Sequence, residues 1–357
     1  MLDVPRPPSR TPGPPLVRGV RSLGEREVCP RLLQCRASHA PRRRHPQPRR
    51  RGRLMLARWE PGAAGDQRGC RGGRAIADLP GDQGMSGRFD RQSFLGADSE
   101  ELLAGLRVAI VGYGGGGSHF GQQLAHIGVG EILVFDDDIV EETNLNRLVG
   151  GVSADVAAIT PKVTVADRVI SGVNPAARVR QFGCKWSEAA EELAGAHVVL
   201  GAVDSFAERL NLERFCRRFL LPYIDIGMDV IQRSEGYEIV GQVILSSPEH
   251  QCLRCMGLIN DAVLEKEERA RQYGDAGSKP QVIWPNGVLA STAVGLLIQL
   301  ITPWQPLPAA AVHLEYNGNT STLQPAPRLA YMLEHGHGCS HYPRDEVGDA
   351  LFGAPLF

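Results

Sequence analysis

The sequence contains no run of about 18 consecutive apolar residues, although 43% of its 357 residues are hydrophobic. A membrane-spanning helix needs a stretch of about that length, so we expect no transmembrane segment and no membrane partner. A secretory leader and internal repeats are also missing from the sequence. The missing leader predicts a cytoplasmic protein whose eight cysteines stay reduced, and a close cysteine pair then indicates metal or redox chemistry.

Lysine is absent from residues 1–84, which hold 18 arginines and seven acidic residues, a net charge of +11. Residues 85–357 hold 21 basic and 33 acidic residues, a net charge of −12. Two segments of such opposite charge do not favour one folding unit. The first is rich in proline, arginine and glycine and has no apolar periodicity, which predicts a disordered tail.

The boundaries of the folded part follow from this contrast. Met85 directly precedes the first motif described below, so a mis-assigned start is an alternative explanation of the tail. An arginine-rich tail can bind nucleic acid or an acidic surface, but a mis-assigned start or inert disorder is the stronger interpretation, and we expect no nucleic-acid partner. Its many prolines also argue against an amphipathic mitochondrial leader. We therefore expect a tail over residues 1–84, a domain over residues 85–343 and a short tail over residues 344–357.

Short apolar runs that end in glycine or an acid alternate with helical stretches along the domain. The expected strands are residues 107–112, 131–136, 177–181, 196–201 and 222–226, and the expected helices between them are residues 118–127, 162–171 and 208–219. This alternation predicts an α/β fold with a Rossmann-like, doubly wound and mostly parallel sheet. A C-terminal extension follows, with strands at 237–246 and 310–316, a charged helix or crossover segment at 258–280, and an apolar helix at 286–301.

A glycine-rich turn follows the first expected strand, with the spacing G-x-G-x-x-G. The glycines that we assign to nucleotide binding are Gly112, Gly114, Gly115 and Gly117. Glycines at these positions let the backbone turn tightly and approach a phosphate at the positive end of a helix. Asp136 lies 24 residues after Gly112 and ends the second strand, where an acid accepts hydrogen bonds from ribose hydroxyls. Up to this point an NAD-dependent oxidoreductase fits equally well.

The residues after the second strand distinguish an NAD site from a site that cleaves a nucleoside triphosphate. Asp138 belongs to an acidic run that begins at Asp136, and Asn144, Arg147 and Lys162 follow it. An NAD site needs no such group of amide and cationic side chains, whereas a triphosphate that is being cleaved needs them to stabilise the shifting charge. Asp204 comes directly after the fourth strand, where a carboxylate can hold Mg²⁺ that bridges phosphate oxygens.

Taken together, these motifs resemble those of the ThiF/MoeB/HesA-type adenylyltransferases and of the adenylation halves of ubiquitin-activating enzymes. The resemblance covers about residues 86–343. The matching motifs, in order, are Arg88-Phe89-Asp90-Arg91-Gln92-Ser93-Phe94-Leu95-Gly96, the glycine-rich loop, Asp136-Asp137-Asp138, Asn144-Leu145-Asn146-Arg147, Pro161-Lys162 and Val203-Asp204. Two positions depart from the family pattern, with Leu148 in place of the usual Gln and Ser205 in place of the usual Asn.

The resemblance implies a role for each matching residue. Asp136 would bind the ribose of ATP, and Asp204 would hold Mg²⁺. Arg91 would reach the nucleotide of a partner subunit, which implies a homodimer. The residues implied to bind phosphate are Asn144, Arg147 and Lys162, and those implied to act in catalysis are Arg91, Arg147, Lys162 and Asp204.

A separate cysteine motif indicates a metal site. Cys252-Leu253-Arg254-Cys255 has the spacing of a zinc half-site. The family closes its structural zinc site with a second cysteine pair near the C-terminus, and here that region offers Cys339 with histidines on either side. We expect Zn²⁺ bound by Cys252, Cys255, Cys339 and one histidine, and we favour His341 over His337. The alternative is that the second half-site has been lost and that no metal binds.

Enzymes of this kind that pass their substrate on as a thioester have a nucleophilic cysteine in the crossover segment. No cysteine lies between Cys255 and Cys339. Cys216 falls in an apolar helix and is expected to be a core residue, whereas Cys184 follows a strand and has no evident activating neighbour. The chain therefore resembles the members whose reaction ends at the adenylate.

The resemblance implies ATP-dependent adenylation of the C-terminal glycine of a ubiquitin-like or sulfur-carrier protein that ends in Gly-Gly. An isopeptidase or a conjugating enzyme would act in the same pathway. Three alternatives stay open: a tRNA-modifying relative that adenylates a small carboxylate, a non-catalytic dimer partner, and an NAD-dependent oxidoreductase.

Overall fold

A computed structural model of the chain describes residues 87–248, 250–272, 280–305, 311–336 and 338–350. The chain divides into two compact units, Met1–Leu79 and Pro80–Phe357, and the described residues all belong to the second. The expected tail over residues 1–84 lies outside the described residues, so its predicted disorder stays a prediction. The expected C-terminal tail is described only as far as residue 350.

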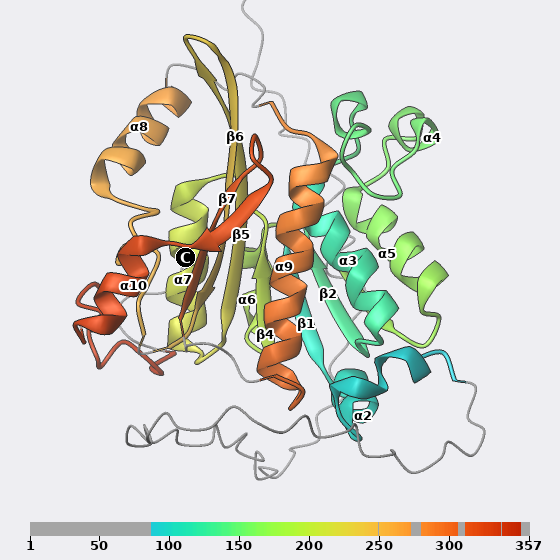
Figure 1. The fold of residues 1–357 in the computed structure, drawn as a ribbon. Coiled ribbons are helices and arrows are strands. Elements are labelled where there is room, and N and C mark those ends of the chain that lie inside the picture. The colour runs from blue at the N-terminus through green and yellow to red at the C-terminus, as the bar shows by residue number, and fades with distance from the viewer. Residues whose placement is uncertain (1–86, 249, 273–279, 306–310, 337, 351–357) are drawn as a thin grey trace, which may run out of the picture. The chain divides into compact units, whose positions relative to one another are not determined.

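An eight-stranded sheet forms the centre of the second unit, in the order β3-β2-β1-β4-β5-β6-β7-β8 (Figure 1). Strands β1 to β5 are parallel to their neighbours, and β6, β7 and β8 continue the sheet antiparallel. This confirms the predicted α/β class, with a mostly parallel sheet and a C-terminal extension. The strands are β1 (Arg107–Val111), β2 (Glu131–Phe135), β3 (Arg178–Phe182), β4 (Val198–Gly201), β5 (Tyr223–Arg233), β6 (Gly236–Ser246), β7 (Val312–Asn317) and β8 (Thr322–Pro325).

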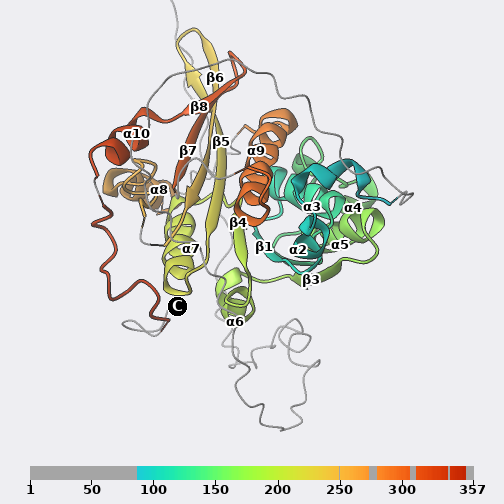
Figure 2. The same cartoon turned by 60° about the horizontal axis from the view of Figure 1, so that its bottom comes forward.

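Helices cover both faces of the sheet. In Figure 2, α3, α5 and α9 lie on one side of β4 to β7, and α7, α8 and α10 lie on the other. The α-helices are α2 (Ser99–Ala104), α3 (Gly115–Ile127), α4 (Ser153–Ala157), α5 (Lys162–Val173), α6 (Ala190–Leu193), α7 (Phe206–Arg218), α8 (Asp261–Gln272), α9 (Ile283–Ile301) and α10 (Pro327–Glu334). The short 3-10 helices are η1 (Asp90–Leu95), η2 (Glu142–Asn144) and η3 (Trp186–Ala189).

The two helical layers explain why the central strands are apolar throughout. Successive side chains of a strand point to opposite faces, and both faces here are covered. In β1, Val108 and Ile110 belong to the core under α3, α5 and α9, whereas Ala109 and Val111 belong to the core under α7. Strand β1 therefore reads as an unbroken apolar run and not as an alternating one.

The structure adds elements that the sequence did not predict. Strand β5 was expected to end at residue 226, but it continues to Arg233 and forms a long hairpin with β6. In its second half Asp229, Gln232 and Arg233 are exposed and the apolar residues are only partly buried, so the buried apolar run ends before the strand does. Strand β8 and helix α10 were also not predicted. The charged segment over 258–280 contains α8, and residues 273–279 lie outside the described residues.

Among the described residues, helix α9 is the element that bears on the expectation of no transmembrane segment. This helix is long and apolar enough to cross a membrane by length and composition, although polar residues interrupt its sequence. Half of its apolar window is buried inside the protein, where it packs against α3, β5 and β6. Core helices of soluble proteins have the same features, so this is weak evidence for a membrane span.

A buried histidine on β7 makes the stability of this fold dependent on pH. Burial lowers the pKa of His313 to about 4, and its Nδ1 is among the buried polar atoms that have no hydrogen-bond partner. An unfolded histidine titrates near pH 6.5, so the unfolded chain binds more protons than the native one between about pH 4 and 6.5. The stability that the neutral ring allows is therefore complete above about pH 6.5 and falls as the pH drops toward 4.

We predict that His313→Phe removes this part of the pH dependence. Denaturant unfolding at pH 7, 6 and 5 should give a shallower decline for the variant, by up to about 1.4 kcal/mol per pH unit. His126→Gln, at an exposed position in the last turn of α3, is the control and should keep the wild-type slope. An unchanged slope in the His313→Phe variant would contradict the assignment.

Candidate functional site

A cleft of about 590 Å³ opens at the carboxyl ends of the parallel strands. The chain leaves β1 toward β2 and β3 on one side and returns to β4 on the other side, so the sheet order reverses there. In open α/β sheets, ligands bind in the crevice at such a reversal. The predicted site residues that line the cleft are Gly112, Gly114, Gly115, Asp136, Asp138, Asn144, Arg147, Lys162 and Asp204.

The glycine-rich turn joins β1 to α3 at one wall of the cleft. Gly112 has φ +87°, and a Cβ there would lie 2.7 Å from the carbonyl oxygen of Ala202. Gly117 does not line the cleft, because it packs beneath the turn. A Cβ on Gly117 would lie only 1.9 Å from the Gly112 carbonyl oxygen. These two glycines therefore allow the turn that directs the positive N-terminal end of α3 at the cleft.

Asp136 lies at the end of β2 with both carboxylate oxygens held by the backbone. Oδ2 accepts a hydrogen bond of 2.6 Å from the Tyr113 amide, and Oδ1 accepts one of 3.0 Å from the Asp138 amide. Burial raises the pKa of this carboxyl, and the Lys162 ammonium and the two backbone donors oppose that shift. Asp136 is therefore fixed in orientation at the cleft wall, with remaining lone pairs that can accept hydroxyl donors.

Lys162 begins α5 and points between two carboxylates. Its Nζ lies 2.7 Å from Asp138 Oδ2 and 3.8 Å from Asp136 Oδ1. The lysine and Asp136 are both largely buried, whereas Asp138 is mostly exposed. An anion that enters the cleft can replace the exposed Asp138 as the partner of this ammonium group.

Asn144 is the last residue of η2, and Arg147 lies in the turn that follows. The side-chain oxygen of Asn144 accepts a hydrogen bond of 3.1 Å from the Glu141 amide, which leaves the amide N–H groups as the donors that an anion meets. Arg147 donates to the Thr143 carbonyl oxygen and, at 3.0 Å, to Asn146 Oδ1. Both side chains therefore present donors to the cleft, as a phosphate site requires.

Asp204 lies on the opposite wall, in the loop between β4 and α7. Gln281 Nε2 lies 3.4 Å from its Oδ1. The following residue, Ser205, is the N-cap of α7, and its hydroxyl accepts a hydrogen bond of 3.3 Å from the Glu208 amide. Serine and asparagine are both favoured N-caps, so the departure from the family's Asn keeps the helix cap.

A buried ion pair under this wall was not predicted from the sequence. Arg209 lines the cleft and donates to Asp225 on β5, and Tyr223 donates to the other oxygen of Asp225 at 2.7 Å. Breaking a buried pair of this kind by removing one partner costs about 3–5 kcal/mol, so the pair fixes the first turn of α7 against β5. In the sequence Arg209 looked like a helix-surface charge, and the only signal was an acid inside the apolar run at 222–226.

Arg91 does not line the cleft of its own chain. It lies exposed on η1, while the cleft is formed by the strand ends and their loops. Its implied role at a partner's nucleotide stays a prediction. The two cysteines considered as nucleophiles differ in position: Cys216 is buried, and burial raises the pKa of its thiol, whereas Cys184 lines the cleft.

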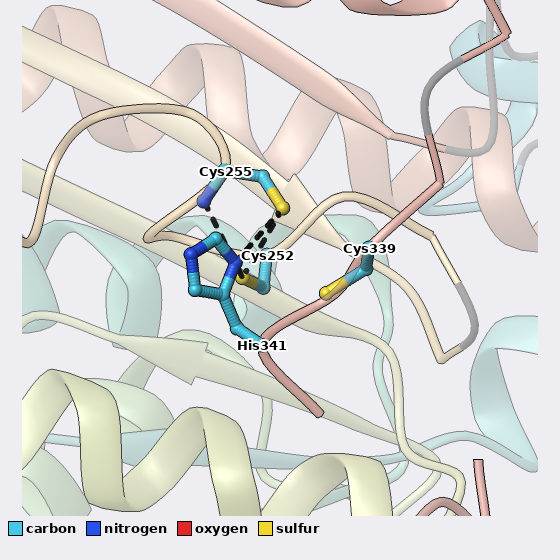
Figure 3. Close-up of side chains that lie close together, drawn as sticks. All are labelled: Cys252, Cys255, Cys339 and His341. Atoms are coloured by element: carbon cyan, nitrogen blue, oxygen red, sulfur yellow. Dashed lines mark hydrogen bonds between the residues drawn. The ribbon is translucent and has the colours of Figure 1, made fainter. Parts of the chain in front are cut away.

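A second cluster brings together Cys252, Cys255, Cys339 and His341 (Figure 3). Their candidate ligand atoms all lie within 4.8 Å of one another. The two sulfurs of the Cys-x-x-Cys motif are 3.6 Å apart, and His341 Nδ1 lies 3.5 and 3.2 Å from them. Tetrahedral zinc with bonds of about 2.3 Å to sulfur and about 2.0–2.1 Å to nitrogen implies ligand separations of about 3.5–3.8 Å.

The four side chains therefore fit a Cys₃His zinc site. His341, the favoured histidine, lies in the cluster, and the alternative His337 lies outside the described residues. The turn that carries the first two cysteines is also held by Arg328 on α10, which donates a 2.6 Å hydrogen bond to the Cys255 carbonyl oxygen.

Comparisons with known proteins agree with this geometry. The chain is 35% identical to the SAMP-activating enzyme E1 of Haloferax volcanii over 164 residues, which cover 45% of this chain and 57% of that protein. It is 29% identical to the sulfur carrier protein ThiS adenylyltransferase of Escherichia coli over 224 residues, 60% of this chain and 83% of that protein. The match to the Haemophilus influenzae molybdopterin-synthase adenylyltransferase is 32% identical and spans 58% of that protein.

The chain thus spans less than two thirds of the length of some of these curated relatives. Among solved structures, Escherichia coli MccB with ATP has a TM-score of 0.57 at 21% identity, and the match covers 69% of this chain and 73% of that one. This likeness shows the fold alone. The model of the ThiF family matches residues 89–333, which is more than half of the sequence. The chain therefore belongs to the ThiF family.

Proposed function

We propose that this chain is an adenylyltransferase that uses ATP to activate the C-terminal carboxylate of a small ubiquitin-like or sulfur-carrier protein. The observation that carries the proposal is the convergence of the glycine-rich turn, Asp136, Lys162 and Asp204 in one cleft. The names of the relatives support it, because they are a SAMP-activating enzyme, a molybdopterin-synthase adenylyltransferase and a sulfur carrier protein adenylyltransferase.

The proposed reaction needs no nucleophilic side chain. A carboxylate oxygen of the substrate attacks the α-phosphorus of ATP, the bond to the bridging oxygen breaks, and acyl-adenylate and pyrophosphate form. Asp136 would accept hydrogen bonds from the ribose, and Asn144, Arg147 and Lys162 would donate to phosphate oxygens. Positioning and charge stabilisation by these groups supply the rate.

Asp204 is the proposed magnesium ligand. Its carboxylate lies across the cleft from the phosphate-binding side chains, and hard carboxylate oxygens suit Mg²⁺. When bound, the ion would neutralise phosphate charge as the pyrophosphate leaves. The buried Arg209–Asp225 pair holds the helix that follows Asp204 and so keeps this carboxylate at its wall.

We predict that Asp204→Ala lowers ATP–pyrophosphate exchange at least about 100-fold, because the leaving phosphates lose their cation. The assay uses candidate carrier proteins that end in Gly-Gly, with radiolabelled pyrophosphate. Asp98→Asn, at the N-cap of α2 and outside the cleft, should leave exchange unchanged. Near-normal exchange in the Asp204→Ala variant would refute the assigned role. Exchange that responds only to a small carboxylate would favour the tRNA-modifying alternative, and no exchange with any carrier would favour a non-catalytic partner.

We further propose a homodimer in which Arg91 acts on the nucleotide of the partner subunit. Two observations support it: Arg91 lies away from its own cleft, and large apolar side chains are exposed nearby on η1 and after α9. Phe94 is 66% exposed, and its ring packs edge-on against the exposed ring of Trp304. Trp284 and Val288, in the first turns of α9, are further large apolar side chains that are exposed.

We predict that Arg91→Ala also loses exchange activity and that mixing it with Asp204→Ala restores part of it. In a mixed dimer, one of the two sites keeps both residues, so random reassembly should recover about a quarter of the wild-type activity. The mixture is tested after dissociation and reassociation, with each variant alone as the control. No recovery, with both variants dimeric by light scattering, would exclude action across the interface.

We also propose that Cys252, Cys255, Cys339 and His341 bind a structural Zn²⁺, in keeping with a reducing, cytoplasmic location. Purified protein should hold about one zinc per chain by elemental analysis, since four ligands close a structural site. Cys339→Ala should lose most of this zinc, and Cys184→Ser, outside the cluster, should retain it. Fewer than about 0.3 zinc ions per chain in the wild-type protein after mild purification would refute the proposed zinc site.

A further inference from the structure

Glu213 is a fully buried carboxylate in the second half of α7, one turn beyond the cleft residue Arg209 on the same face of the helix. It accepts hydrogen bonds from Ser246 Oγ at 2.6 Å and from the Leu253 amide at 2.9 Å on Oε1. The other oxygen, Oε2, accepts a hydrogen bond of 3.0 Å from the Tyr342 hydroxyl. Burying a charged carboxylate costs free energy unless hydrogen-bond donors compensate for the lost water, and these three donors do so.

Two of these donors are neighbours of the metal ligands. Leu253 follows Cys252 within the Cys-x-x-Cys turn, and Tyr342 follows His341 directly. The two segments lie about 90 residues apart in the sequence, and each is held by its own oxygen of the same carboxylate. Glu213 is thus a single side chain that connects both halves of the four-ligand cluster.

Arg217, one turn further along α7, completes the connection. Its guanidinium lies 3.7 Å from Glu213 Oε1 and donates to Ser246 Oγ and to the His250 carbonyl oxygen, at 2.9 and 3.0 Å. It also lies 4.8 Å from the centre of the Tyr342 ring. Glu213 and Arg217 therefore hold both the segment that leads to the first two cysteines and Tyr342, the residue next to His341.

The C-terminal segment has a second, separate anchor on the same helix. Glu346 Oε1 forms ion pairs with the guanidinium groups of Arg218, at 2.9 Å, and Arg214, at 3.4 Å. This anchor fastens the segment to α7 through side chains other than Glu213 and Arg217. Docking of the segment and alignment of the ligands are thus carried by different side chains.

We propose that Glu213 is a positioning residue that aligns the two halves of the metal cluster, so that α7 assembles the ligand set before an ion binds. This inference rests on the metal site proposed above. Groups behind the ligands commonly set metal affinity, and their loss typically weakens binding about 10–100-fold. In this chain the group behind the ligands is a helix carboxylate that orients the backbone and a neighbouring side chain.

The test measures zinc affinity directly on the full chain. Metal-free protein is prepared under reducing conditions and titrated with Zn²⁺ in competition with a chromophoric chelator. Glu213→Gln keeps the shape of the side chain but removes its charge and one acceptor, and should raise the zinc Kd about 10–100-fold. Tyr342→Phe removes only the hydroxyl that bonds Oε2 and should cause a smaller increase. Glu346→Gln is the matched control, and its Kd should stay within about threefold of the wild type.

The outcomes separate this inference from the proposals on which it rests. Wild-type affinity in both Glu213→Gln and Tyr342→Phe would overturn the positioning role. An equal loss in Glu346→Gln would also overturn it, because the effect would then be general docking of the C-terminal segment. If Glu213→Gln does not fold, Tyr342→Phe alone decides. A wild-type chain that binds no zinc would refute the metal site itself, and pyrophosphate exchange measured in parallel reports separately on the adenylation chemistry.

Discussion

The reversal of strand order beside β1 is the constraint on which the rest of the site depends. All five parallel strands end at the same edge, so their following loops meet there. The glycine-rich turn and Asp136 come from β1 and β2, while Asp204 comes from β4 on the other side of the reversal. Residues nearly 100 positions apart thereby face one cleft, and the helix α3 directs its positive end toward it.

Charge balance within that cleft follows from its burial. Asp136 is buried although a carboxylate is better solvated at the surface. Two backbone amides and the Lys162 ammonium group compensate for the hydration that it loses. The same lysine holds the exposed Asp138, a partner that water solvates well and that an anion can replace. Such a site is arranged to receive negative charge, with donors already oriented, so little reorganisation is needed when phosphate enters.

Helix α7 links the two functional regions of the domain. Its first turn is fixed by the buried Arg209–Asp225 pair under the cleft, and its last turns carry Glu213 and Arg217 against the cysteine turn. A helix held by buried charges at both ends is a rigid connector, because each pair is costly to break. A metal ion bound by the proposed ligands would therefore fasten the C-terminal segment to the same element that borders Asp204.

Much of the fold and of the candidate site could be read from local pattern. Apolar runs, the glycine spacing and the ordered Asp, Asn, Arg and Lys motifs depend on neighbours in the sequence, so they predicted the parallel strands, the cleft residues and the family. Strand β8 and the outer half of β5 were missed because they are held by pairing with other strands and not by their own composition. Helix α10 was missed because it is held by contacts of Leu329 and Arg328 with residues distant in the sequence.

The sequence by itself therefore determined the class of fold, the nucleotide-type turn and the identity of the metal-type cysteines. Only the tertiary structure decided which charged side chains are buried and which residues they pair with. Arg209 and Glu213 look like ordinary helix-surface residues in the sequence, yet both are buried against segments that arrive from far along the chain. Burial and pairing over such distances depend on the packing of the whole domain, and no local pattern encodes them.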